Sequence, residues 1–130
     1  MRIKLIKEGD LYTLYSIEQG ESATDLLDNL MTSCPKAFAQ IMNRLKTLAD
    51  AGCSFDLRKF NALGDGFFEA KASLGPRIVY FHDGNRIIIC TNGFEKDSRK
   101  IRKRHQRLAE QRRNQFYEAK RLNDLQIDHK

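Results

Sequence analysis

One stretch, residues 66–109, limits the possible fold more than any other part of the chain. It contains three short segments with the composition of β-strands, followed by a strongly basic segment with helical periodicity. The three segments are Phe67–Ala72, Arg77–His82 and Arg86–Thr91. The last one holds the continuous apolar run Ile87–Cys90, which is typical of a strand covered on both faces. Asp83-Gly84-Asn85 favours a tight hairpin between the second and third segments. We therefore predict a central sheet followed by a basic helix.

The residues before this stretch add strands and two helices. We predict strands at Arg2–Lys7 and Leu11–Ile17 and helices that start after Ser22 and at Pro35. Ser22 and Asp25 have the spacing of a capping box, and proline is well accommodated in the first turn of a helix. Gly52 closes the second helix, and we expect a connecting loop at Cys53–Asp65. The order predicts an α+β fold, with a small, mainly antiparallel sheet, the helices together over one face and a C-terminal basic helix.

We expect the C-terminal helix to start near Ser98, with Asp97 or Ser98 as its N-cap. Its apolar side carries residues at helical spacing. These are Ile101, His105, Leu108, Ala109, Arg112, Phe116 and Ala119. Residues 123–130 have weak periodicity and are expected to fray, which leaves a single domain over residues 1–122.

Composition narrows the class of protein. A net charge of +6 and a pI near 9.4 favour a nucleic acid, an acidic protein or an anionic membrane as partner. The three cysteines, Cys34, Cys53 and Cys90, show no CxxC spacing, so we expect no metal site, no cofactor and a reducing compartment. No apolar run approaches the roughly 20 residues of a membrane-spanning helix, and no signal-peptide core follows Met1. We predict a soluble, cytoplasmic protein.

Four motifs carry a resemblance to a known family. They are Gly66-Phe67-Phe68-Glu69-Ala70-Lys71, Arg77-Ile78-Val79-Tyr80-Phe81, Arg86-Ile87-Ile88-Ile89 and Asn92-Gly93-Phe94-Glu95-Lys96. Together with Leu108-Ala109 at the matching spacing, they resemble the RelE/HigB superfamily of toxins, and most closely its phage-related HigB-like branch. The resemblance covers residues 35–116. It implies that the Gly-Phe-x-Lys motif, Gly93-Phe94-Glu95-Lys96, forms a turn.

The resemblance implies a toxin of a type II toxin–antitoxin pair, a small nuclease that cuts mRNA on the ribosome. Its partners would be mRNA, the ribosome and a cognate antitoxin, often a helix-turn-helix protein. Metal-free cleavage of RNA needs a base for the 2′-hydroxyl, cations at the phosphate and a donor for the leaving oxygen. A site made of lysine and arginine is therefore chemically reasonable, since the ribosome can position the message.

The family pattern points to a candidate catalytic set. Lys71 and Arg77 match basic strand positions that face the phosphate, and Lys96 matches a basic residue beside the cleft. Glu69 is either a base or an ion-pair partner of Lys71 or Arg77. His105 stands where related sequences commonly have Glu, and it is either an acid or base or a satisfied core residue.

The start of the basic helix is the candidate RNA-binding segment. Its cations are Arg99, Lys100, Arg102, Lys103 and Arg104. Some of them are explained as a solvated helix face. However, cations at a helix N-terminus oppose the macrodipole, so this clustering predicts a bound anion such as RNA.

Two other functions remain open for the same fold. One is a non-catalytic inhibitor like the ParE branch, which poisons DNA gyrase. The other is a decayed phage-derived RNA-binding module, of which His105 in place of Glu would be a sign.

Overall fold

The computed structural model describes residues 1–52, 58–73, 75–95 and 99–129, with the side chains of helix α3 described from residue 103 onward. The helices are α1 (Ala23–Ser33), α2 (Pro35–Ala51) and α3 (Arg99–Arg121). The strands are β1 (Arg2–Glu8), β2 (Thr13–Ile17), β3 (Phe60–Gly64), β4 (Phe67–Lys71), β5 (Pro76–Asp83), β6 (Ile87–Glu95) and β7 (Gln126–Asp128). The predicted α+β class, with a mainly antiparallel sheet, is confirmed.

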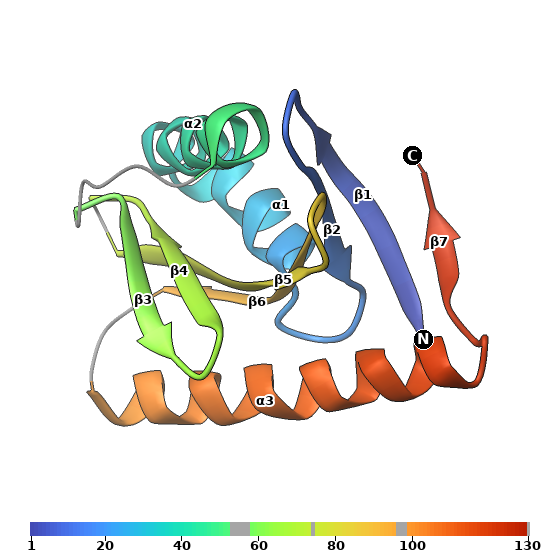
Figure 1. Ribbon diagram of the computed structural model, residues 1–130. Helices are drawn as coiled ribbons and strands as arrows, with labels where there is room; N and C mark the ends of the chain where they lie inside the picture. Colours follow the sequence, from blue (N-terminus) through green and yellow to red (C-terminus); the bar gives the residue numbers. More distant parts are fainter. Residues whose placement is uncertain (53–57, 74, 96–98, 130) are drawn as a thin grey trace.

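The strands that the structure describes form one sheet in the order β3-β4-β5-β6-β2-β1-β7 (Figure 1). The four strands from β3 to β6 are antiparallel neighbours, and so are β1 and β2. Two contacts are parallel, β2 with β6 and β1 with β7. Strand β6 therefore lies inside the sheet, between β5 and β2, which agrees with its apolar sequence.

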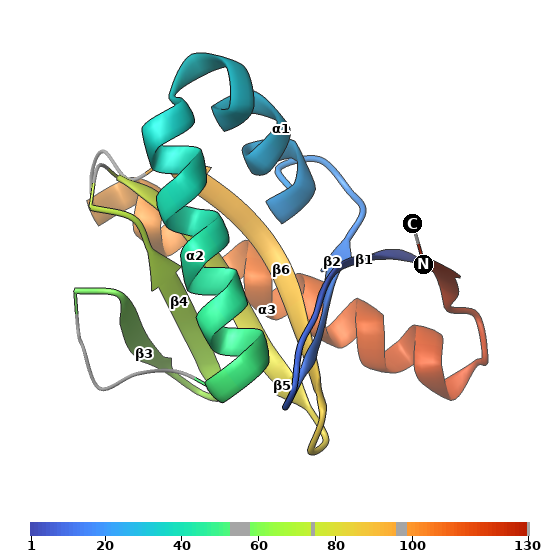
Figure 2. The same ribbon diagram turned by 90° about the horizontal axis from the view of Figure 1, so that it is seen from above.

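The helices cover both faces of the sheet. Helices α1 and α2 pack on one face, and α3 runs along the opposite face (Figures 1 and 2). The position of the two N-terminal helices confirms the prediction, whereas the expectation that all helices share one face is wrong. The reason is the sheet itself, since apolar side chains alternate to both sides of β4 and β5 and each side needs a cover. Leu30, Ile41 and Tyr80 belong to one core, and Phe67, Phe81 and Phe116 to the other.

Local signals at the N-terminal helices behave as the sequence predicts. Ser22 and Asp25 form a reciprocal capping box at α1, with Asp25 N donating to Ser22 Oγ at 3.0 Å. Pro35 occupies the first turn of α2, and Gly52 ends that helix with φ of 77°. The Asp83–Asn85 hairpin is also confirmed, with Asp83 and Ile87 paired across it.

Three other local predictions are wrong. Part of the expected loop forms β3, an edge strand whose one buried residue, Phe60, gives little alternation to detect. Asn92–Glu95 belongs to β6 rather than to a turn, because β5 continues the antiparallel pairing as far as Glu95. The tail that was expected to fray forms β7, which is held by parallel pairing with β1. The proposed N-cap, Asp97 or Ser98, lies outside the described residues.

Candidate nucleic-acid interface

Lys71 and Arg77 are brought together by strand pairing. They are direct partners in the antiparallel register of β4 and β5, where the next pair on the same face is Glu69 with Val79. Val79 belongs to the core beneath α3, so the alternation of side chains places Lys71 and Arg77 on the α3 side, at the end of β4. Strand pairing therefore places two of the candidate residues side by side.

Both residues line a pocket of about 470 Å³. Its other walls come from α2 and from the residues around the start of β3. The charged residues of the lining are Arg44, Arg58, Lys59, Lys71 and Arg77. No acidic or aromatic side chain belongs to the described lining, so the pocket is a cationic cavity suited to phosphate oxygens.

Backbone hydrogen bonds fix the geometry of this cationic pocket. Arg77 Nη1 donates to the carbonyl oxygens of Ala72 and Pro76 at 2.9 and 3.0 Å, which holds the guanidinium near the turn between β4 and β5. Arg44 Nε donates to the Lys71 carbonyl oxygen at 2.9 Å. The Lys71 amide in turn donates to the Lys59 carbonyl oxygen at 2.7 Å. Hydrogen bonds to the backbone therefore hold the side chains of Arg44 and Arg77 in position.

Arg44, Arg58 and Lys59 were missed as site residues. Arg44 belongs to the second predicted helix, and Arg58 and Lys59 belong to the segment that was expected to be a loop. The sequence signal was present, since basic residues lie directly before β3 and off the apolar stripe of α2. These residues lie near Lys71 only because α2 crosses the sheet at this point. No local sequence pattern specifies where a helix crosses a sheet.

Glu69 lies beneath α3 and has 0% of its surface exposed. It does not belong to the lining of the cationic pocket. Its burial makes a role as the base that reaches the 2′-hydroxyl of a bound RNA implausible on geometric grounds.

His105 is placed beside the cationic pocket and not inside it. Its ring is 4% exposed and stacks on Phe94, with centroids 3.7 Å apart and planes at 9°. Phe94 is the β6 partner of Arg77, but neither Phe94 nor His105 belongs to the described lining of the cationic pocket. His105 instead lines a second pocket of about 480 Å³, together with Glu21, Arg104 and residues of α1.

The remaining predicted site residues differ in how far they are described. Lys96 lies outside the described residues, and so do the side chains of Arg99, Lys100 and Arg102. Lys103 is exposed on α3. Arg104 pairs with Glu21 at 2.6 Å across the mouth of the second pocket.

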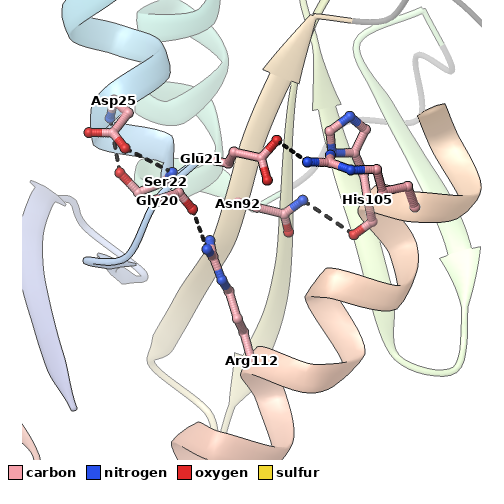
Figure 3. A network of polar contacts seen from close by, with 8 residues as sticks. Gly20, Glu21, Ser22, Asp25, Asn92, His105 and Arg112 are labelled. Carbon is pink, nitrogen blue, oxygen red and sulfur yellow. Dashed lines mark hydrogen bonds and ion pairs between the residues drawn. The ribbon is translucent and has the colours of Figure 1, made fainter.

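A buried polar network ties α3 to the sheet behind this basic end (Figure 3). Arg112, which is 4% exposed, donates to the carbonyl oxygens of Thr91 and Gly20, the former at 2.8 Å. Asn92 Nδ2 donates to the His105 carbonyl oxygen at 3.3 Å and Asn92 Oδ1 accepts from Thr91 Oγ1 at 2.7 Å. The network therefore fixes the position of His105 relative to β6.

The sequence matches one known protein family over most of its length. The model of the family described as phage derived protein Gp49-like (DUF891) matches residues 28–114. The chain belongs to this family. The Gp49-like family is associated with the RelE/HigB toxins. The match includes all five cations of the pocket and the first half of α3.

No curated protein matches the sequence of this Gp49-like chain. Among the helices that the structure describes, none is both long and apolar enough to cross a membrane.

Proposed function

We propose that this Gp49-like protein is the toxin of a type II toxin–antitoxin pair and cleaves mRNA on the ribosome without a metal ion. The observation that carries the proposal is the cross-strand pair Lys71–Arg77, which opens into a pocket lined by cations. The association of the family with RelE/HigB toxins supports the same reading.

The proposed chemistry is an internal transfer at phosphorus. The 2′-hydroxyl loses its proton to a base, and its oxygen attacks the adjacent phosphorus to form a 2′,3′-cyclic phosphate. The bond to the 5′-oxygen of the next nucleotide breaks, and that oxygen leaves as a hydroxyl after it takes up a proton. Negative charge grows on the non-bridging oxygens in the transition state, where fixed cations stabilise it. Arg77 suits this role because two carbonyl groups orient its planar guanidinium, and Lys71 adds a compact positive charge beside it.

His105 has a supporting role in this proposal. Its ring is covered by Phe94, so it shapes the wall next to the site rather than exchanging protons with RNA. Lys96 and the cations of the α3 N-terminus, including Lys103 and Arg104, are proposed to hold the RNA backbone. The mechanism leaves the base unassigned.

The proposed partners follow from the same function. They are mRNA, the ribosome and an antitoxin of the helix-turn-helix class encoded beside the toxin, all in the cytoplasm. Co-expression of the protein from the neighbouring reading frame should restore growth. That protein should also co-purify with this chain.

The decisive experiment compares induced wild-type protein with Lys71→Ala and Arg77→Ala variants. We expect growth arrest and mRNA cleavage with wild type, and cleavage lower by about 100-fold or more in each variant, as for loss of one transition-state donor. Primer extension on translated messages measures the cuts. Lys46→Ala is the matched control, because Lys46 is an exposed α2 residue that pairs with Asp50 at 3.4 Å outside the pocket.

Undiminished growth arrest in both pocket variants would contradict the residue assignment. Intact mRNA together with accumulated cleaved gyrase–DNA complexes would contradict the ribonuclease itself and favour a ParE-like activity.

A further inference from the structure

The wall of the cationic pocket opposite the Lys71–Arg77 pair has no assigned role. Arg44 enters it from the middle of α2, and Arg58 and Lys59 enter from the segment that leads into β3. Arg44 is fastened at its Nε to the Lys71 backbone, which holds its guanidinium beside the end of β4. We call these three residues the α2-side wall.

Three cations of the cationic pocket, Arg44, Lys59 and Lys71, are joined by hydrogen bonds through the Lys71 backbone. Among the described residues, no carboxylate lies within ion-pair distance of Arg44, Lys59 or Lys71. All three are half-buried, so water screens their mutual repulsion less than it would on an open surface. An anion in the pocket would relieve this repulsion.

The size and lining of the pocket restrict the anion. About 470 Å³ is within the range of roughly 300–1,000 Å³ for small-ligand sites, which suffices for a nucleotide unit. Base-reading sites for single strands use aromatic side chains for stacking, and the described lining has none. The pocket therefore suits the sugar–phosphate backbone more than the bases.

We propose that Arg44, Arg58 and Lys59 form a second phosphate-binding position for single-stranded RNA, adjacent to the position at Lys71 and Arg77. The RNA strand bends into the pocket at the end of the sheet. One of its phosphates contacts the Lys71–Arg77 pair, and a neighbouring phosphate contacts the α2-side wall. A flexible single strand can follow this path, whereas a stiff duplex cannot bring successive phosphates of one strand into a pocket. The choice of RNA as the polyanion rests on the proposed function.

The test is the salt dependence of binding to a short, fluorescein-labelled 2′-O-methyl RNA, which lacks the 2′-hydroxyl needed for cleavage. Each phosphate contact on a single strand contributes about 0.7 to the slope of log K against log salt. We expect the Arg44→Gln/Lys59→Gln variant, which removes the contact with one phosphate, to lower this slope by about 0.7, and Lys59→Gln alone to lower it by a smaller amount. The single variant keeps the hydrogen bond from Arg44 Nε to the Lys71 carbonyl oxygen, so it tests the site even if the double variant folds poorly.

The matched control is Lys36→Gln/Lys46→Gln, which removes the same charge from exposed positions on α2. We expect its slope to equal that of wild type. Equal slope changes in the control and the α2-side variants would overturn the proposal, because only net charge would then matter. Duplex RNA that competes as well as single-stranded RNA would overturn it too, and stronger competition by a polyglutamate peptide would assign the pocket to an acidic protein segment.

The two proposals fail in different ways. If Lys71→Ala and Arg77→Ala abolish mRNA cleavage while the α2-side variants bind RNA with the wild-type slope, the second phosphate position is wrong and the ribonuclease stands. If the slope falls as expected while Lys71→Ala and Arg77→Ala leave growth arrest intact, the phosphate position stands and the catalytic assignment is wrong.

Discussion

At the scale of single residues, Arg112 is a buried charge that backbone carbonyl groups hold in place. Its guanidinium lies in the interior, and its hydrogen bonds go to carbonyl groups of the segment before α1 and of β6. Burial lowers the pKa of Arg112, and the negative charges of Glu21 and Asp25 partly oppose that shift. The side chain stays protonated and joins three elements that are distant in sequence.

Replacement of Arg112 should therefore destabilise the fold. Arg112→Ala leaves two carbonyl groups without their donor, and each buried unsatisfied group costs about 1–3 kcal/mol, so we expect a loss of roughly 3 kcal/mol. Urea unfolding followed by circular dichroism measures the change. Arg107→Ala, at an exposed position of α3, should stay within about 0.5 kcal/mol of wild type. A similar loss in both variants would show that the buried contacts of Arg112 are not the cause.

His82 gives a pH-dependent contribution of known sign. Burial among Tyr12, Phe68 and Tyr80 lowers the pKa of His82 from its usual value near 6.5. Below pH 6.5 the unfolded chain takes up a proton that the folded protein resists, so the free energy of unfolding falls as pH falls through that value. Thermal melts of wild type and His82→Gln between about pH 7.5 and 5.5 test this. The melting temperature of wild type should fall more steeply than that of the variant, and parallel profiles would refute the assignment.

At the scale of elements, the contact between α1 and β6 depends on Gly93. A Cβ at this position would lie 3.0 Å from Leu26 Cβ and 3.1 Å from Ala23 Cα, so helix and strand approach as closely as the backbone permits. The Gly93 amide also donates to the Glu21 carbonyl oxygen at 3.0 Å. Because Glu21 pairs with Arg104, the α1–β6 contact also positions the basic end of α3.

Gly93→Ala should therefore separate α1 from β6 and weaken the fold by about 1–3 kcal/mol, the usual effect of overpacking. Chemical unfolding gives the loss. Gly20→Ala is the control, since a Cβ at Gly20 would meet no atom within 4 Å, and it should change stability by less than about 0.5 kcal/mol. A Gly93→Ala variant as stable as the control would mean that α1 can shift without strain.

At the scale of the whole molecule, local chemistry explains which parts of the fold were predictable. Capping at Ser22, the proline at α2 and the hairpin after Asp83 are decided by neighbouring residues, and all three were predicted. Strands β3 and β7 were not, because both are edge strands that bury little apolar surface of their own, and β7 also depends on pairing with the distant β1. The residues of the candidate site also differ in whether local sequence or long-range packing brings them together. Lys71 and Arg77 follow from strand register, whereas Arg44 joins them through the packing of α2.

The parallel pairing of β2 with β6 has a consequence for synthesis. Thr13 pairs with the nearby Glu8 on one side and with Ile87 on the other, so the first two strands join the rest of the sheet only after most of the protein has been translated. Phe94, which is the partner of Arg77 in β6, is translated later still. Contacts between such distant segments slow folding and prolong exposure of apolar surface. A nascent chain therefore completes the sheet beside the cationic pocket near the end of its own translation, when it is about to leave the ribosome that made it.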